Sequence, residues 1–224
     1  MPLTIILAEC GIELIPKKIR NHSAVRKNMT SKLYSSQLLD NAIHHSAMIN
    51  LPNINKRGRP DITHFCLLNA LGSSLNKTGN LKIYIHTIHN KIYELNPEIR
   101  ITKNFNRFKG LMAKLLIDGS IITETSKLIY PFEGSLKELI DTFENPEIYL
   151  FTRKGKLIKN YRDLFVEDLS KNYVVIVGGF QKSSFSTNIY DLSENLISLS
   201  QHPLEAWVAI NRIITYYELT YGIL

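Results

Sequence analysis

The chain has 224 residues, 44% of them hydrophobic, and this supply of apolar side chains suits a folded core and argues against a disordered chain. Its formal net charge of +7 favours a polyanionic partner, which is either a nucleic acid or an acidic membrane surface. The two cysteines, Cys10 and Cys66, form no CxxC pair, which argues against a disulfide framework and indicates a reducing compartment.

The N-terminal apolar run is predicted to be a strand. It is short, no Lys or Arg precedes it and Glu9 follows it, so we expect Pro2–Ala8 to be a buried first strand and not a signal peptide. No stretch of about eighteen apolar residues occurs, so we expect no membrane-spanning segment and no membrane partner.

Residues 15–36 are basic and polar and are predicted to form a loop with a mobile portion. The cations of this stretch are Lys17, Lys18, Arg20, Arg26, Lys27 and Lys32. A helical spacing of apolar residues follows from Leu38 to Ile43. After a second loop, residues 51–60, the helix of sequence DITHFCLLNAL is expected to begin at Pro60, because a first helical residue does not use the N–H that proline lacks.

The middle of the chain is predicted to contain a hairpin and two helices. Two β-rich runs flank His89-Asn90 within Leu81–Asn96, a pattern typical of a hairpin. Apolar residues from Phe105 to Leu116 recur at the spacing of an amphipathic helix. A further helix is expected over Ser135–Phe143.

The C-terminal part is predicted to supply three strands. Glu147–Thr152 is the first, and a charged turn over Arg153–Lys156 is expected to follow it. Tyr173–Val177 is wholly apolar and rich in β-branched residues, which indicates a central buried strand. Leu196–Ser200 is the third strand, and Pro203 is expected to begin the last helix.

Strands that alternate with helices predict an α/β fold with a mostly parallel sheet. Ligands of such sheets bind beyond the carboxyl ends of the strands. The sequence therefore draws attention to the segment after Leu150, the Gly178-Gly179 turn and the segment Leu199–Leu204.

The segment Arg57-Gly58-Arg59-Pro60-Asp61 is the first candidate site. Asp61 either accepts helix N–H groups or pairs with Arg59, and an Arg held by a carboxylate presents a fixed fork of donors to a phosphate or a base edge. The alternative interpretation is a solvated loop with a helix cap.

A second cationic group surrounds the start of the Phe105 helix. Its members are Arg100, Lys103, Arg107 and Lys109. Lys103 and Arg107 fall on the polar side of the helix and could line a groove for an RNA backbone, although an ordinary polar face has the same pattern.

Two backbone segments are candidates for ligand contact. Glycine at Gly178-Gly179 lets a backbone approach a ligand closely, yet no dinucleotide or phosphate-loop fingerprint follows, so a nucleotide-binding enzyme stays a weaker alternative. In Leu199–Leu204 a strand end passes towards a helix, where exposed backbone groups could read an adenine with Leu204 as an apolar wall.

Other enzyme classes lack their motifs. The sequence contains no HExxH and no GxSxG. His86 and His89 are three apart in an expected strand and therefore face opposite sides, and His44-His45 diverge on a helix. We expect no metal site.

The segment Arg57–Thr87 (RGRPDITHFCLLNALGSSLNKTGNLKIYIHT) resembles the nucleolar essential protein family of SPOUT-class methyltransferases. The resemblance continues in Asn96-Pro97, Arg100–Leu116, Val175–Phe180 and the final LSQHPLEAWVAINRI, and covers about two-thirds of the chain in the expected order.

The resemblance implies one SPOUT domain over residues 1–224, with a C-terminal trefoil knot, a homodimer and a family-specific insertion of helix and hairpin at Arg57–Asn96. It implies S-adenosyl-L-methionine as methyl donor and methylation of N1 of a pseudouridine in small-subunit ribosomal RNA. A role in small-subunit biogenesis is implied too. We expect a cytoplasmic archaeal protein, or a nucleolar one if the source is eukaryotic.

By position, the resemblance places Arg59 against RNA with Asp61 holding it, and Arg100, Lys103 and Arg107 along the RNA strand. The residues implied to enclose the donor are Thr152, Gly178, Ser183, Leu199, Ser200, Gln201, His202, Pro203 and Leu204. No strong general base stands out, so water or a network near Asp61 is expected to take the proton of the target N–H.

Three departures from the family pattern stand out. Ser183 replaces a second glycine, Gly72–Asn76 replaces Asp-Ser-Pro-Leu-Asn, and Gln201-His202 replaces Asn-Tyr. Two alternative functions stay open: a non-catalytic RNA-binding assembly factor, and a related SPOUT enzyme that acts on transfer RNA.

Overall fold

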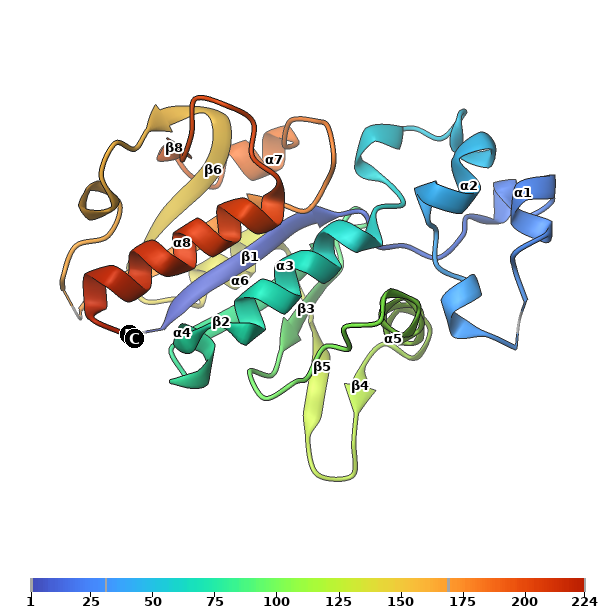
Figure 1. The fold of residues 1–224 in the computed structure, drawn as a ribbon, viewed down its shortest axis with the longest axis horizontal. Coiled ribbons are helices and arrows are strands. Elements are labelled where there is room, and N and C mark those ends of the chain that lie inside the picture. Colours follow the sequence, from blue (N-terminus) through green and yellow to red (C-terminus); the bar gives the residue numbers. More distant parts are fainter. Residues whose placement is uncertain (1, 31, 169, 224) are drawn as a thin grey trace.

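One eight-stranded sheet, in the order β4-β5-β3-β2-β1-β7-β6-β8, organises the molecule (Figure 1). The computed structural model describes residues 2–30, 32–168 and 170–223. The central strands are parallel: β1 (Leu3–Cys10) pairs with β2 (Leu81–Thr87) and β7 (Asn172–Gly178), while β6 (Pro146–Leu157) pairs with β7 and β8 (Leu196–Ser198). The predicted α/β fold with a mostly parallel sheet is confirmed.

Three antiparallel strands extend one edge of this sheet. β3 (Ile92–Leu95) pairs with β2 and completes the predicted hairpin, in which Asn90 takes a φ of +58° that asparagine tolerates. β5 (Lys127–Phe132) follows β3, and β4 (Ile121–Ile122) closes the edge. Sequence patterning missed β4 and β5, because they are short and only half-buried.

Helices cover both faces of the sheet. The long helices α3 (Pro60–Gly72) and α8 (Ala206–Tyr221) lie side by side across one face (Figure 1), where they share a core with α5 (Phe105–Asp118). The opposite face packs against α6 (Leu136–Asp141) and α7 (Thr187–Tyr190). α3 begins at Pro60 as predicted, and α4 (Ser74–Lys77) follows it.

Residues 15–51 form a small helical module, so the prediction of a loop over residues 15–36 is wrong for the residues that the structure describes. Its elements are η1 (Lys17–Ile19), α1 (Ser23–Arg26), η2 (Tyr34–Ser36) and α2 (Asn41–Met48). A separate hydrophobic cluster that includes Val25 and Met48 holds them together. Ser31 lies outside the described residues, and Leu38 and Leu39 precede α2.

Two boundaries near the C-terminus differ from the prediction. Arg153–Lys156 belongs to β6 and is not a turn, because β6 continues past a bulge and pairs with β8 on both sides of it. A Cβ at Gly155 would lie 2.4 Å from the Ile197 nitrogen, so only glycine allows this close pairing. The last helix begins at Ala206 and not at Pro203, which lies in the segment before it.

The lengths and hydropathies of the helices bear on the question of a membrane-spanning segment. None of those formed by residues 2–30, 32–168 and 170–223 is both long and apolar enough to cross a bilayer. Two further short helices lie in connecting segments: η3 (Ile54–Lys56) precedes α3, and η4 (Tyr161–Asp163) lies between β6 and β7.

Two buried histidines are held in the neutral form by backbone hydrogen bonds. His86 Nδ1 accepts a hydrogen bond from the Glu9 N–H at 3.1 Å, and His44 Nδ1 accepts one from the Asp40 N–H at 3.1 Å. A ring nitrogen that accepts cannot carry a proton. Burial lowers the pKa of both side chains below the ordinary value.

Acidification from pH 7 to pH 5 should therefore lower the melting temperature. The unfolded chain takes up protons at these histidines near pH 6.5, at about the ordinary pKa, while the folded chain resists protonation until lower pH. His86→Asn keeps an acceptor without the titration and should reduce the loss, whereas His45→Asn, at an exposed position, should not. The same pH dependence in His86→Asn as in the wild type contradicts this assignment.

Candidate active site

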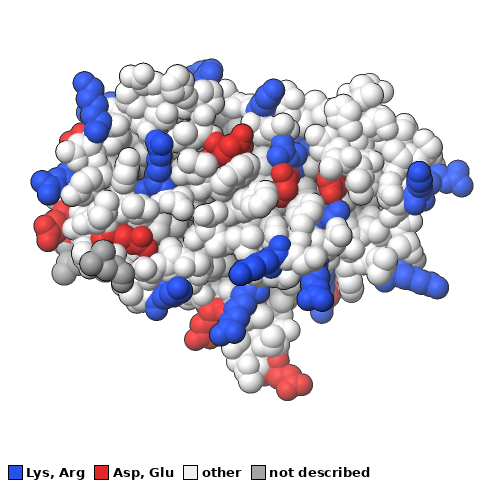
Figure 2. Space-filling view, in the orientation of Figure 1, with Lys and Arg blue, Asp and Glu red and all other residues white. Residues whose placement is uncertain are grey.

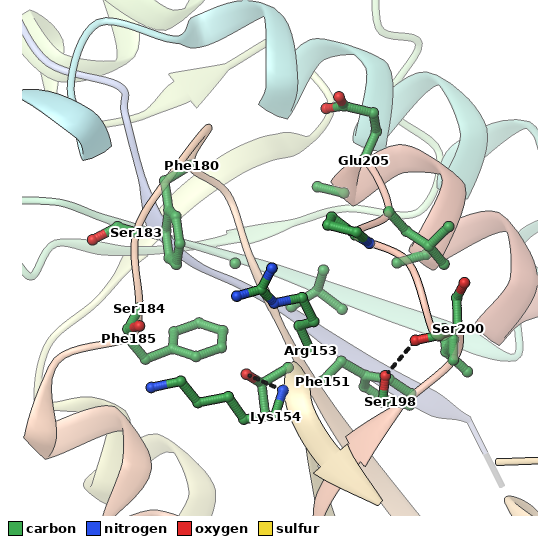
Figure 3. A pocket seen from close by; sticks show the side chains of 18 of the residues that line it. Phe151, Arg153, Lys154, Phe180, Ser183, Ser184, Phe185, Ser198, Ser200 and Glu205 are labelled. Carbon is green, nitrogen blue, oxygen red and sulfur yellow. Dashed lines mark hydrogen bonds between the residues drawn. The ribbon is translucent and has the colours of Figure 1, made fainter. Parts of the chain in front are cut away.

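A cavity of about 580 Å³ lies beyond the carboxyl ends of β7 and β8 and beside the bulge of β6, at the end of the sheet where ligands of parallel sheets bind. β6 contributes Thr152 and Arg153, and β7 contributes Gly178. Two chain segments complete the walls: residues 180–185 after β7, and the stretch from β8 into α8 (Figure 3).

The first wall is an aromatic turn. Phe180 and Phe185 meet edge to face with ring centroids 5.4 Å apart, and both line the cavity (Figure 3). Gly179 allows the turn to lie against β1, because a Cβ there would come within 2.4 Å of Cys10 Sγ. The predicted close backbone approach at Gly178-Gly179 is therefore explained by packing on β1 as well as by access to the cavity.

The second wall is backbone held in place by side chains. Ser198 Oγ donates to the Ser200 carbonyl at 2.9 Å, and the His202 N–H donates to Ser200 Oγ at 3.0 Å. From α8, Arg212 Nη1 donates to the Leu199 carbonyl at 3.1 Å. This wall can offer fixed backbone groups to a planar ligand such as adenine, with Leu204 as an apolar surface.

The structure brings eight of the nine predicted donor-site residues together around this cavity. They are Thr152, Gly178, Ser183, Leu199, Ser200, His202, Pro203 and Leu204. Gln201 is exposed and does not line the cavity. Sequence reasoning missed Arg153, Lys154 and Glu205. The first two lie within β6, directly after Thr152, where a charged turn was expected.

Arg59 and Asp61 form a forked ion pair at the start of α3. Arg59 Nε contacts Asp61 Oδ1 at 2.8 Å, and Arg59 Nη2 contacts Asp61 Oδ2 at 2.7 Å. Asp61 raises the pKa of the Arg59 guanidinium, and the carboxylate of Glu205 on the cavity wall adds to this effect. Arg59 is therefore positioned by Asp61.

Backbone hydrogen bonds at Gly11 connect this arginine to the aromatic wall. The Arg59 N–H donates to the Gly11 carbonyl at 3.2 Å, and the Gly11 N–H donates to the Gly179 carbonyl at 3.3 Å. A Cβ on Gly11 would lie 2.7 Å from the Lys56 carbonyl, so the contact requires glycine. The cavity and Arg59 thus belong to one connected unit within a single chain.

A buried ion pair reinforces the same connection. Lys56 Nζ contacts Glu9 Oε2 at 2.7 Å and stands 5.1 Å from the centre of the Phe180 ring. Glu9 Oε2 also accepts the Ser186 N–H at 3.3 Å. The first strand, the loop before Arg59 and the cavity wall therefore share one hydrogen-bonded network.

Comparison with known proteins identifies the family of this chain. The family model of the EMG1/NEP1 methyltransferases matches residues 5–218. The chain belongs to this family. It is 38% identical to the ribosomal RNA small subunit methyltransferase Nep1 of Staphylothermus marinus, over 100% of this chain and 98% of that protein. It is 35% identical to the Nep1 of Thermococcus kodakarensis, over 99% and 100% of the two chains.

A solved structure within the EMG1/NEP1 family has the same fold. The crystal structure of Archaeoglobus fulgidus Nep1 bound to S-adenosylhomocysteine matches with a TM-score of 0.84 and 31% identity, over 98% of this chain and 99% of that one. The family resemblance and the α/β architecture predicted from the sequence are both confirmed.

The departures from the family pattern are structurally mild. Ser183 lines the cavity and has no positive φ, so the backbone does not require a glycine there. Gly72 ends α3 with open space where a Cβ would lie. His202 lines the cavity, whereas its neighbour Gln201 does not.

Not every predicted cation is available to a ligand. Arg57 is buried and bound to Glu13, with Nε 2.7 Å from Oε1, and Lys109 is buried and bound to Asp40 at 2.8 Å. Lys109, a member of the cationic group around the start of this helix, is therefore not available to a ligand, because Asp40 already neutralises its charge inside the protein. Arg100, Lys103 and Arg107 are exposed before and within the first turn of α5, but none lines the cavity.

His86 and His89 make structural hydrogen bonds. His86 is buried on β2, and His89 Nε2 lies 3.0 Å from Glu13 Oε2 in the following turn. No group of three or more His, Cys, Asp or Glu in the described part of the chain is arranged to hold a metal ion.

Replacing Arg212 should weaken binding in the cavity. Arg212→Met removes the donor that holds the Leu199 carbonyl, a hydrogen bond worth about 1 kcal/mol, which corresponds to roughly fivefold in affinity. Calorimetry with S-adenosylhomocysteine measures this loss, and Arg212→Lys, which keeps a donor, should recover part of it. Unchanged affinity in Arg212→Met, with an unchanged melting temperature, contradicts a role for this contact.

Proposed function

We propose that this protein transfers the methyl group of S-adenosyl-L-methionine to N1 of a pseudouridine in small-subunit ribosomal RNA and thereby serves small-subunit biogenesis. One observation supports this most strongly: Gly178 lines the cavity, and its neighbour Gly179 is linked through backbone hydrogen bonds of Gly11 to Arg59, the arginine held by Asp61, in a chain of the EMG1/NEP1 methyltransferase family. The cavity is the first component of this arrangement, and Arg59 is the second. The first component suits a methyl donor and the second suits RNA.

The cavity fits the donor in size and chemistry. Its volume is within the range of small-molecule sites, and its walls combine apolar side chains with backbone groups. The A. fulgidus relative, which binds S-adenosylhomocysteine, has the same fold. We assign the donor to the eight predicted residues that line the cavity, with Phe180 and Phe185 as its aromatic wall, and we retain Gln201 only as a backbone neighbour.

The proposed reaction does not require a strong general acid or base from the protein. The base nitrogen attacks the methyl carbon in line with the sulfonium sulfur, the carbon–sulfur bond breaks, and S-adenosylhomocysteine leaves. The proton of the target N–H passes to water. The protein chiefly aligns the nucleophile and the methyl group at near-attack distance, so fixed walls matter more than a strong base.

RNA contacts extend from Arg59 to the exposed cations of α5. Arg59, fixed by Asp61, presents its remaining donors to the phosphate backbone, and Arg100, Lys103 and Arg107 continue the contact. The target base leaves the stack to enter the cavity, as bases do in other enzymes that modify them.

We also propose that residues 1–224 form one SPOUT domain with a C-terminal trefoil knot and with Arg57–Asn96 as a family-specific insertion, and that the chain forms a homodimer. An apolar patch on the outer side of α3 and α8 supports the dimer: Phe65 is 44% exposed and lies 5.2 Å from Trp207 between ring centroids. Archaeal relatives support a cytoplasmic location, which would be nucleolar in a eukaryote.

Incubation with labelled donor and purified RNA tests the activity. We expect label on small-subunit ribosomal RNA, at a pseudouridine, and none on transfer RNA. Label on transfer RNA alone supports the related tRNA enzyme instead. Donor binding without transfer to either RNA, or no donor binding at all, supports an assembly factor and contradicts the enzyme.

Paired substitutions test how Arg59 and Asp61 act. Arg59→Ala should lower RNA affinity about tenfold, or about 1.4 kcal/mol, and Asp61→Asn should cause a similar loss because it frees the arginine. Both variants should bind S-adenosylhomocysteine normally. If Asp61→Asn keeps full RNA affinity yet loses all methyl transfer, Asp61 acts on the proton and the positioning role is wrong.

Sedimentation measures the proposed dimer. The wild type should sediment at twice the chain mass of 25.7 kDa. Phe65→Glu places a charge in the apolar patch and should shift the protein to the monomer. Ile122→Glu, a matched change at an exposed residue on β4, should leave the mass unchanged. A monomeric wild type contradicts the proposal.

A further inference from the structure

The helical module of residues 15–51, called the basic module here, has an unusual charge distribution. It contains six Lys and Arg residues and a single acid, Asp40, and no other acid occurs between Glu13 and Asp61. All six cations are exposed, whereas Asp40 is buried, accepts the Ala42 N–H and pairs with Lys109 at 2.8 Å. The module therefore presents positive charge to solvent with no acid exposed among its described residues.

Figure 2 shows the consequence for the surface. At the end of the molecule around α1, the drawn face carries Lys and Arg side chains and no acidic ones, whereas acidic side chains occur among the cations elsewhere on that face. An exposed aromatic ring, that of Tyr34 on η2, comes two residues after Lys32 in the sequence. Cations interleaved with an aromatic ring are typical of surfaces that hold single-stranded nucleic acid.

The module is attached at both places where the proposed RNA contacts lie. The Asn41 N–H at the start of α2 donates to the Gly58 carbonyl at 2.7 Å, directly before Arg59. On its other side Asp40 binds Lys109 of α5, and η2 packs along α5, where a Cβ at Gly110 would meet Ser35 at 3.9 Å. The module therefore lies next to Arg59 and α5, so an RNA strand that contacts Arg59 or Arg107 can continue onto the module.

We propose that the basic module is a second RNA-binding surface, which holds the phosphate backbone of the RNA that flanks the target nucleotide. This inference rests on the proposed function but concerns affinity and reach and not the chemistry. Its position between Arg59 and α5 favours RNA over an acidic membrane, which would need no such alignment with the cavity. The module acts by counterion release, so its contribution is largest at low salt.

A charge-neutralising triple variant tests the module. Lys17→Gln, Lys18→Gln and Lys27→Gln together remove three exposed cations, and Lys77→Gln, Lys82→Gln and Lys137→Gln remove three exposed cations elsewhere as a matched control. Filter binding of a full-length small-subunit ribosomal RNA transcript is measured across salt concentrations. Calorimetry with S-adenosylhomocysteine and methyl transfer to the same transcript are measured in parallel.

The module variant should bind the transcript at least tenfold more weakly at low salt. The magnitude of its slope of log affinity against log salt should decrease by about two, because each of the three lost phosphate contacts contributes roughly 0.7 to the slope. The control should keep the wild-type slope, and both variants should bind S-adenosylhomocysteine as the wild type does.

A module variant that binds RNA like the control overturns this inference while leaving the proposed function intact. Binding to phosphatidylserine vesicles is measured in parallel. A module variant that loses vesicle binding but keeps wild-type RNA binding also overturns this inference. Absence of methyl transfer by the wild type counts instead against the proposed function, because the slope comparison does not depend on turnover.

Discussion

The site depends on two backbone hydrogen bonds made by one residue. Gly11, just past the end of β1, accepts the Arg59 N–H and donates to the Gly179 carbonyl. These bonds place the start of α3 beside the turn that follows β7, although the two segments are far apart in the sequence. Because the bonds are made by the main chain in a space without room for a Cβ, their geometry tolerates little movement.

The rest of the site follows from this arrangement. The parallel strands β7 and β8 end beside the bulge of β6, so the segments after β7 and β8 enclose a cavity together with residues 151–154 of β6. The buried Lys56–Glu9 pair and the Phe180 ring stiffen the side nearest to Arg59. Since the second wall offers backbone groups held by Ser198, Ser200 and Arg212, the side chains at Gln201 and His202 can depart from the family pattern without loss of the wall.

Much of this could be predicted from the sequence, for identifiable reasons. Tyr173–Val177 is apolar on both faces, and only a central strand accommodates such a run; Pro60 marks the start of α3 because few other positions tolerate it. The Arg59–Asp61 pair could be predicted because the two residues are close in sequence. The prediction of the donor-site residues rested largely on the family resemblance, and all of these residues except Gln201 line the cavity.

What escaped prediction depends on contacts between distant segments. Nothing near Gly11 in the sequence distinguishes it from an ordinary turn glycine, and its role emerges only when α3 and β7 come to it. Lys109 and Arg57 look like ligand-binding cations until Asp40 and Glu13 are found to neutralise them inside the fold. Arg153–Lys156 resembles a turn by composition, yet pairing with β8 makes it part of a strand.

In the proposed reaction, the cavity and Arg59 act on one base at one place. A crystal structure of the protein with S-adenosylhomocysteine and a small-subunit ribosomal RNA fragment tests this arrangement. We expect the adenosyl group between the Phe180 wall and Leu199–Leu204, an extruded base that faces the sulfur, and a phosphate bound to Arg59. RNA bound on a face that shares no opening with the cavity, in one chain or across two, would contradict it.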